Sequence, residues 1–417
     1  NMDKIVVHGN RPLSGVVKIS GAKNAVLPVM AATLLAPGKY LIKNVPDLRD
    51  TRTMMKLLNI IGANTIFDKG SLTIDSSSAN NPEAPYDLVK TMRASFYVLG
   101  PLISRFGRVN VSLPGGCAWG PRPVDYHLKG LEQLGAKLNL DGGNIHAEAK
   151  ELIGNDIHFE FPSVGATGNL AMAAVKASGT TRLYNCAKEP EITQLCEFLN
   201  SMGANIEGIG TETLIIHGAD ELHSADIDII PDRIEAGTFL MAGALLGEIE
   251  VRDIIPGHLD KVVHKLREAG CILKINQNSI IITPPEKIKS VDMTTAVYPG
   301  FPTDLQAQWV AIMSLADGSS VVTDTVYHDR FSHIPELSRL GANIKVENNT
   351  AFIRGKNTLV GAPVMSTDIR ASASLIIAAL AAKGETQISR VYHIDRGYEN
   401  IEQKFESLGG DIRRISE

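Results

Sequence analysis

Amphipathic segments that end in glycine recur along the chain at intervals of about 70 residues. Their apolar residues lie three and four positions apart, a spacing that predicts a helix with one buried face. Each glycine suits the left-handed conformation that commonly ends a helix. A repeat of this length predicts a fold built from six similar units. The six glycines are Gly62, Gly135, Gly203, Gly270, Gly341 and Gly409.

Strands and a second, more apolar helix complete each predicted unit. In five units the amphipathic helix precedes two stretches that alternate apolar and polar residues around a turn, as in residues 136–148, which predicts a β-hairpin. The apolar helix comes earlier in the unit, for example over residues 25–35 and 371–382, and should be buried. The predicted unit is helix, strand, helix and two-stranded hairpin, so the fold class is α/β.

Cations stand at the start of several of these apolar helices. Lys23, Arg93, Arg233 and Arg370 occupy such positions. Helix starts offer free N–H groups and the positive end of the helix dipole, so their convergence predicts an anion-binding cleft between two domains of three units each. The alternative for any one cation is a helix cap or a surface ion pair.

Composition describes a globular protein, not a disordered or nucleic-acid-coating one. The chain of 417 residues is 44% hydrophobic and 21% charged, with a formal net charge of −5. Its length predicts two domains of about 200 residues. No stretch reaches the roughly 18 apolar residues that a membrane span needs. The four cysteines lack the spacing of zinc ligands or a disulfide framework, which favours a reducing, cytoplasmic location.

Residues 114–127, with the sequence PGGCAWGPRPVDYH, are rich in glycine and proline. This density predicts a loop that contains neither a central strand nor a helix. Cys117 lies close in sequence to Arg122 and His127, and nearby cations lower the pKa of a thiol and make it reactive. The alternative is a thiol that serves only as a small hydrophobic side chain.

Seven motifs, in order along the chain, resemble those of the bacterial UDP-N-acetylglucosamine 1-carboxyvinyltransferases, a family of enolpyruvyl transferases. The resemblance implies two inverted α/β barrels with their helices inside. It places residues 1–20 and 231–417 in one domain and residues 21–230, with the Cys117 loop, in the other. The motifs are ISGAKNA (19–25), PGGCA with RPVD (114–118 and 122–125), PSVGAT (162–167), YPGFPTD (298–304), ELSR (336–339) after Arg330, DIRASA (368–373) and HIDRGYE (393–399).

The implied reaction joins the 3-hydroxyl of UDP-N-acetylglucosamine to C2 of phosphoenolpyruvate and releases phosphate, the first committed step of peptidoglycan synthesis. Phosphoenolpyruvate has two anionic groups, so several cations must neutralise it while water is excluded. By position in the motifs, Lys23, Arg122 and Arg396 are expected at the phosphate, and Arg330 and Arg370 at the carboxylate. Asn24 is expected to contact both substrates.

Two proton transfers accompany this reaction. Asp304 matches the family carboxylate that accepts the proton of the sugar hydroxyl, although a helix N-cap after Pro302 and Thr303 is an alternative role. Cys117 matches the thiol that protonates C3 of phosphoenolpyruvate and that fosfomycin alkylates. With Cys117 and Arg122 on it, the loop is expected to act as a lid.

The resemblance also implies a nucleotide-sugar site and no metal or organic cofactor. Surrounding residues expected to support the site, or to form ordinary ion pairs, are His127, Glu189, Glu191, Asp232 and Asp368. Two residues depart from the family pattern: Phe161 stands where some members have Lys, and Trp119 where a smaller aliphatic residue is common. The residues expected to contact UDP-N-acetylglucosamine are Asn24, Arg93, Arg122, Pro123, Val124, Asp125, Tyr126, Ser163, Val164, Gly165, Asp304 and Val326.

Two other functions compete with this interpretation. The related enolpyruvyl transferase that acts on shikimate 3-phosphate has the same fold, but it lacks the Gly-Gly-Cys loop and the Arg-Pro-Val-Asp segment. A non-catalytic repeat scaffold that binds protein or nucleic acid is the second alternative. The net charge of −5 and the placement of cations in apolar surroundings argue against a nucleic-acid partner.

Overall fold

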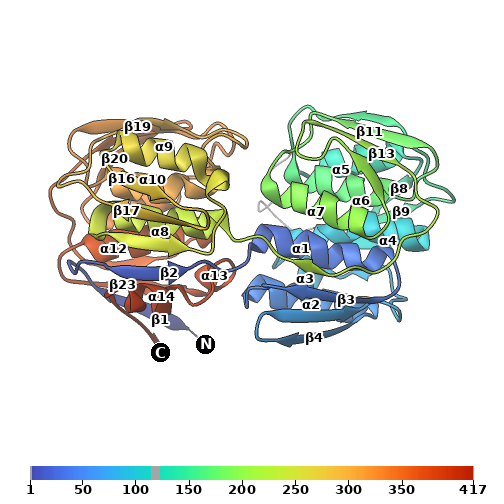
Figure 1. The fold of residues 1–417 in the computed structure, drawn as a ribbon, viewed down its shortest axis with the longest axis horizontal. Helices are drawn as coiled ribbons and strands as arrows, with labels where there is room; N and C mark the ends of the chain where they lie inside the picture. Colours follow the sequence, from blue (N-terminus) through green and yellow to red (C-terminus); the bar gives the residue numbers. More distant parts are fainter. Residues whose placement is uncertain (1, 114–122, 417) are drawn as a thin grey trace. The chain divides into compact units, whose positions relative to one another are not determined.

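The computed structural model describes residues 2–113 and 123–416 (Figure 1). The chain divides into two compact units, one formed by Gly21–Ile230 and the other by Asn1–Ser20 with Pro231–Glu417. They are called the 21–230 unit and the 231–417 unit below. In the described part of the chain, no helix combines the length and the apolar character needed to cross a bilayer.

The 21–230 unit alternates buried helices, strands and amphipathic helices. Its elements are α1 (Lys23–Ala32), η1 (Thr33–Leu35), β3 (Lys39–Lys43), α2 (Arg49–Ile61), β4 (Asn64–Asp68), β5 (Ser71–Asp75), β6 (Glu83–Ala84), α3 (Tyr86–Val89), η2 (Arg93–Val98), α4 (Leu99–Phe106), β7 (Arg108–Ser112), α5 (Pro123–Gln133), β8 (Lys137–Asp141), β9 (Asn144–Glu148), β10 (Asp156–His158), α6 (Val164–Ala174), β11 (Thr180–Tyr184), α7 (Pro190–Ser201), β12 (Asn205–Glu207), β13 (Thr213–His217) and β14 (Ile227–Asp228).

The 231–417 unit has the same alternation and takes its first two strands from the start of the chain. Its elements are β1 (Asp3–His8), β2 (Gly15–Lys18), α8 (Arg233–Leu246), β15 (Ile249–Arg252), η4 (Pro256–Leu259), α9 (Asp260–Glu268), β16 (Ile272–Ile275), β17 (Ser279–Thr283), β18 (Met293–Thr294), η5 (Thr303–Leu305), α10 (Gln306–Met313), β19 (Ser319–Thr323), α11 (His333–Arg339), β20 (Asn343–Glu347), β21 (Thr350–Arg354), β22 (Pro363–Met365), α12 (Ile369–Ala381), β23 (Glu385–Ser389), α13 (Tyr392–Asp395), α14 (Ile401–Ser407) and β24 (Asp411–Ser416).

Four-stranded sheets that share one topology cover the helices of each unit. In every sheet of the described chain, a parallel pair is extended by two antiparallel neighbours, as in β14-β3-β5-β4 and β18-β19-β21-β20. Strand β1 takes the position of a hairpin strand between β23 and β24, and β2 pairs with β15. The start of the chain therefore completes two sheets of the 231–417 unit.

Three nearly all-apolar helices form the interior of the 231–417 unit. Along α8, α10 and α12 almost every residue after the first turn is buried, and the three helices pack against one another. In the 21–230 unit, α1 and α6 have the same character, and α4 is buried over its first five residues, Leu99–Ile103. A helix that is apolar on all sides lies inside a protein, while α2 and α9, with one apolar face, lie between this interior and solvent. Figure 1 shows the sheets outside these helices in each unit.

The predicted glycine helix ends are confirmed. Gly62, Gly135, Gly203, Gly270, Gly341 and Gly409 all have φ between +97° and +111°, where a Cβ is unfavourable.

The prediction that residues 114–127 contain no helix is wrong at its C-terminal end. Helix α5 begins at Pro123, and Asp125, Tyr126 and His127 lie in its first turns. Proline is well suited to the first position of a helix, because its fixed φ is helical and its missing N–H has no partner there. Pro123 therefore marks the start of a helix and does not exclude one.

Candidate functional site

Four charged residues that the sequence analysis singled out lie close together in the 231–417 unit, at the starts of its three interior helices. Arg233 is the first residue of α8, Asp304 lies in η5 immediately before α10, and Arg370 is the second residue of α12. Arg330 comes from the segment between β19 and α11. Since α8, α10 and α12 pack against one another, residues far apart in sequence meet at this end of the bundle.

Asp304 lies among the guanidinium groups of these arginines. Its Oδ1 is 2.7 Å from Arg330 Nη1 and 3.8 Å from Arg370 Nε. Burial raises the pKa of Asp304, but Arg330, Arg370 and Arg233 outweigh that effect and hold the pKa well below its usual range. The carboxyl group is therefore ionised at neutral pH. The alternative role of Asp304 as a helix N-cap is not observed, because Pro302 and Leu305 occupy the cap positions of η5 and α10.

Arg370 is the most deeply buried cation of this group. Its side chain is 5% exposed, and its guanidinium lies 5.4 Å from the ring centre of Tyr398. Within the described residues, its Nη1 is buried without a hydrogen-bond partner. Buried donors normally have a partner, so this nitrogen is available to an anionic group.

The other candidate carboxylates at these helix starts act as helix caps. Asp368 accepts hydrogen bonds from the N–H groups of Arg370 and Ala371, and Asp232 accepts them from Ile234 and Glu235. These bonds fix the helix starts that carry Arg233 and Arg370.

Asp324 is a buried residue that sequence reasoning missed. Its Oδ2 accepts hydrogen bonds from Thr303 Oγ1 at 2.7 Å and Gln306 Nε2 at 3.3 Å. Its Oδ1 accepts them from Thr295 Oγ1 at 2.7 Å and from the N–H groups of Val326 and Tyr327 at 3.1 and 2.8 Å. A single Asp after a strand gives no sequence signal for such a role, because its partners come from separate segments.

Arg396 directly follows α13, beside a well-anchored neighbour. Asp395 accepts hydrogen bonds from Arg414 Nη1 and Nη2 at 2.9 and 2.6 Å, and Arg414 lies on the terminal strand β24. The C-terminal strand therefore holds the turn that carries Arg396. The expected role of Arg396 at the substrate phosphate stays a prediction.

Lys23 is buried at the start of α1 in the 21–230 unit. Its Nζ is 2.9 Å from Oδ2 of Asp50, and the two side chains are 10% and 3% exposed. Asp50, in the first turn of α2, was not recognised from sequence, because nothing in the 26 positions between it and Lys23 predicts that α1 and α2 meet there. The neighbouring Asn24 is exposed.

His127 joins the starts of α5 and α6. Its Nδ1 is 3.0 Å from Nδ2 of Asn169, which also donates to the carbonyl of Phe96, while Oδ1 of Asn169 accepts the N–H of Gly100. These partners make Nδ1 the acceptor and leave the proton on Nε2. A Cβ on Gly165 would lie 3.2 Å from that Nε2, so glycine lets α6 begin against the imidazole. Burial, assisted by Arg93, lowers the pKa of His127 to about 3.

Several other nucleotide-sugar candidates of this unit lie around the same two helix starts, whereas Arg93 is the first residue of η2. Val124, Asp125 and Tyr126 lie in the first turn of α5, with Val124 and Tyr126 half-buried and Asp125 exposed. Ser163 caps α6 by accepting the N–H of Ala166, and Val164 and Gly165 follow it. Pro123 is the first residue of α5. The structure therefore brings these two predicted segments together, although their role stays untested.

Cys117, Arg122 and Trp119 lie outside the described residues. The other three cysteines are free and buried, and burial raises the pKa of Cys186 and Cys196 to about 12 and that of Cys271 to about 11. These three thiols are protonated and shielded at neutral pH, which makes them unreactive.

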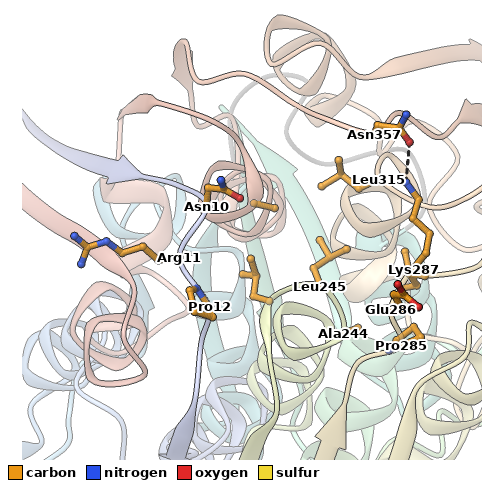
Figure 2. Close-up of a pocket in the computed structure, with 13 residues that line it drawn as sticks. Asn10, Arg11, Pro12, Ala244, Leu245, Pro285, Glu286, Lys287, Leu315 and Asn357 are labelled. Carbon is orange, nitrogen blue, oxygen red and sulfur yellow. Dashed lines mark hydrogen bonds between the residues drawn. The ribbon is translucent and has the colours of Figure 1, made fainter.

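A hollow of about 390 Å³ lies at the other end of the interior helices of the 231–417 unit, beside Leu246 and Ala381, the last residues of α8 and α12, and Leu315, which follows α10. Figure 2 shows Leu245 and Leu315 among the residues that line it, together with the hydrogen bond that Lys287 Nζ donates to Asn357 Oδ1 at 3.0 Å. None of the described candidate residues lines it. The hollow is therefore separate from the candidate site of this unit.

Comparison with known proteins places these features in a family. A family described as EPSP synthase (3-phosphoshikimate 1-carboxyvinyltransferase) matches residues 7–405. The chain is 54% identical to the UDP-N-acetylglucosamine 1-carboxyvinyltransferase of Chloroherpeton thalassium over 99% of this chain and 97% of that protein. It is 52% identical to the protein of the same name from Chlorobaculum parvum over 99% and 98% of the two chains.

A solved structure shows the same fold. The enolpyruvyl transferase NikO from Streptomyces tendae aligns with a TM-score of 0.91 and 28% identity, covering 100% of this chain and 99% of that one. The predicted enolpyruvyl transferase-like α/β fold is therefore confirmed.

We predict that His127 makes the 21–230 unit sensitive to acid. Its pKa is about 3 when folded and about 6.5 when unfolded, so below pH 6.5 the unfolded chain binds a proton that the folded chain does not. As the pH falls from about 6.5 toward 3, His127 should therefore lower the free energy of unfolding by up to about 1.4 kcal/mol per pH unit. Hydrogen exchange of α6 peptides in urea, at pH 7, 6 and 5, measures the slope.

His127→Gln should flatten this pH dependence, whereas His223→Gln, at an exposed histidine of the same unit, should not. An equal slope in wild type and His127→Gln would contradict the prediction.

Proposed function

Because the chain belongs to the family of UDP-N-acetylglucosamine 1-carboxyvinyltransferases, we propose that it transfers the enolpyruvyl group of phosphoenolpyruvate to the 3-hydroxyl of UDP-N-acetylglucosamine. The O3–C2 bond forms while O3 loses a proton and C3 gains one. C3 then loses a proton as the C2–O bond to phosphate breaks, which restores the enol and releases inorganic phosphate. The reaction is the first committed step of peptidoglycan synthesis.

The observation that carries this proposal is the arginine group around Asp304. Phosphoenolpyruvate needs cations that are held in place and shielded from water. Arg330 and Arg370 are both within 4 Å of Asp304 Oδ1, and Arg370 Nη1 is a buried donor without a partner in the described chain. A planar guanidinium binds a carboxylate through two parallel hydrogen bonds. We assign these two arginines to the substrate carboxylate.

The proposed phosphate contacts are Lys23, Arg122 and Arg396. Buried Lys23 is fixed by Asp50 at 2.9 Å, which supports a role as an oriented cation and not as a mobile surface charge. Arg122 is assigned from its RPVD motif alone, and Arg396 follows the turn that Arg414 anchors. Asn24 is exposed beside Lys23, where we propose that it contacts both substrates.

Asp304 is the proposed acceptor of the sugar hydroxyl proton. Its lowered pKa keeps it in the ionised, proton-accepting form, but the same arginines make it a weak base. A substrate carboxylate that binds Arg330 and Arg370 would compete with Asp304 for these cations and raise its basicity. Bound phosphoenolpyruvate would in this way activate Asp304 toward the hydroxyl group of UDP-N-acetylglucosamine.

The proposed nucleotide-sugar contacts in the 21–230 unit are Arg93, Arg122, residues 123–126 and residues 163–165, with Asp304 and Val326 in the 231–417 unit. The start of α6 supports this assignment, because its free N–H groups and dipole favour an anionic group such as a diphosphate. Neutral His127 keeps its Nε2 proton directed toward that helix start. Phe161 is half-buried two residues before Ser163 and adds no positive charge there.

Cys117 is the proposed proton donor to C3 and the residue that fosfomycin alkylates. The three described cysteines have raised pKa values and are shielded, so selective reaction at the remaining thiol has a physical basis. Free thiols in the described chain also support a reducing, cytoplasmic location.

Phosphate release tests the proposed function directly. The protein should release phosphate from phosphoenolpyruvate when UDP-N-acetylglucosamine is present, and not with shikimate 3-phosphate, because the RPVD segment and the start of α6 are assigned to the nucleotide sugar. The second acceptor is the relevant control, since the matching family description names that reaction. Release only with shikimate 3-phosphate would overturn the substrate, and release with neither would overturn the enzyme.

Asp304→Asn should lower kcat about 10²- to 10⁴-fold, the usual contribution of a general base, since the amide cannot accept the proton. Asp317→Asn, at an exposed carboxylate beyond the other end of α10, is the matched control and should keep wild-type kcat. Steady-state rates of phosphate release measure both. A kcat within a few-fold of wild type in Asp304→Asn would exclude this residue as the base.

Fosfomycin should inactivate the protein and add the mass of one inhibitor molecule at Cys117, because a thiolate opens the epoxide and forms a C–S bond. Intact-protein and peptide mass spectrometry measure the adduct. Cys117→Ser should remain unmodified, while Cys271→Ser, which removes a buried thiol, should be modified like wild type. An adduct on Cys186, Cys196 or Cys271 would refute the assignment.

A further inference from the structure

We propose that Thr303 and Asp324 are positioning residues that hold the guanidinium of Arg330 in place through a hydrogen-bond relay. Arg330 Nη1 donates to Thr303 Oγ1 at 3.3 Å, and Thr303 Oγ1 donates to Asp324 Oδ2 at 2.7 Å. This inference rests on the proposed function, in which Arg330 binds the carboxylate of phosphoenolpyruvate. Neither Thr303 nor Asp324 touches the substrate in this proposal.

The direction of the relay follows from the chemistry of the hydroxyl group. A threonine hydroxyl has one proton, and here a buried carboxylate accepts it. The oxygen can then only accept a hydrogen bond from Arg330. Asp324 therefore turns Thr303 into an acceptor directed at the guanidinium, and the bonds at both ends involve a charged group, which strengthens them.

Asp324 also holds the main chain of Arg330. Gln306 Nε2 donates both to Asp324 Oδ2 at 3.3 Å and to the carbonyl of Arg330 at 2.7 Å. The N–H groups of Val326 and Tyr327 donate to Asp324 Oδ1, so this carboxylate also fixes the backbone of the segment that leads to Arg330. Both the backbone and the side chain of Arg330 thus depend on one side chain that is fully buried.

The relay gives Arg330 a second anchor besides Asp304. In the structure its Nη1 contacts both Asp304 Oδ1 at 2.7 Å and Thr303 Oγ1 at 3.3 Å. When the substrate carboxylate replaces Asp304 as the partner of Arg330, the Thr303 contact keeps the guanidinium in position. Asp304 can then leave its ion pair and accept a proton without loss of the bound substrate.

The test compares two substitutions at Thr303. Thr303→Val keeps the shape and removes the hydroxyl, so kcat/KM for phosphoenolpyruvate should fall about 10- to 100-fold, the value of one hydrogen bond to a charged group. The loss should appear in KM for phosphoenolpyruvate and not in KM for UDP-N-acetylglucosamine. Thr303→Ser retains the hydroxyl and should restore wild-type values. Initial rates of phosphate release, with each substrate varied, measure these constants.

Thr295→Val is the matched control. It removes another hydroxyl donor of Asp324, at 2.7 Å from Oδ1, from a residue that has no hydrogen bond to Arg330. It should lower the urea midpoint at least as much as Thr303→Val and keep the wild-type KM for phosphoenolpyruvate. An equal rise of KM in both variants would show general loosening and overturn the relay.

Other outcomes separate the relay from the proposed function. Wild-type protein that releases no phosphate contradicts the proposed function and, with it, the role of Arg330. An active wild type with an unchanged KM in Thr303→Val contradicts the relay alone. Should Thr303→Val fail to fold, Thr303→Ala compared with Thr303→Ser decides the same question, because only the serine keeps the hydroxyl.

Discussion

Burial of charge at the starts of apolar helices is the constraint on which this structure depends. Helices α8, α10 and α12 are buried along nearly their whole length, so a charged side chain at their first turns enters a region of low polarity. An unpaired charge there is expensive, and removal of one partner of a buried pair leaves the other uncompensated. Asp304 therefore stabilises the positions of Arg330 and Arg370 through its ion pairs, and the proposed reaction uses the same carboxylate.

This constraint links the proposed base to the proposed anion site. The arginines that hold the pKa of Asp304 below its usual range are the groups that phosphoenolpyruvate is expected to engage. A carboxylate with a strongly lowered pKa is a poor base, and its ion pairs must weaken before it accepts a proton. In the proposed mechanism, binding of phosphoenolpyruvate and activation of Asp304 toward UDP-N-acetylglucosamine are thereby coupled through Asp304, Arg330 and Arg370. This proposed coupling requires that Arg330 keep its position, and the hydrogen bonds through Thr303 to Asp324 are the contacts that we propose hold it there.

In the 21–230 unit, different side chains balance the buried titratable groups. Lys23 is neutralised by Asp50, and His127 avoids a buried charge by remaining unprotonated against Asn169. In both cases the partner comes from a separate helix, so the charge state of the site depends on tertiary packing. Burial has a comparable effect on the three described cysteines, because it raises their pKa values and keeps their thiols protonated at neutral pH.

The sequence by itself determined the local structure and the family. Hydrophobic periodicity identified the helices, and glycine identified their left-handed ends, because both depend on a few neighbouring residues. Proline was ambiguous at residue 123, where it begins α5 instead of excluding a helix. The motifs around Lys23, Asp304 and Arg370 identified the candidate site, since each carries its charged residue at a helix start.

Only the tertiary structure decided how these charged residues are balanced. Asp50, Asn169, Thr303 and Asp324 hold the site residues through contacts that join different helices and loops. Such contacts leave no periodic or spacing signal, because the distance along the chain between two partners says nothing about which helix starts converge. The protonation states of Asp304 and His127 follow from their neighbouring charges and from burial, and the packed fold sets both of these factors.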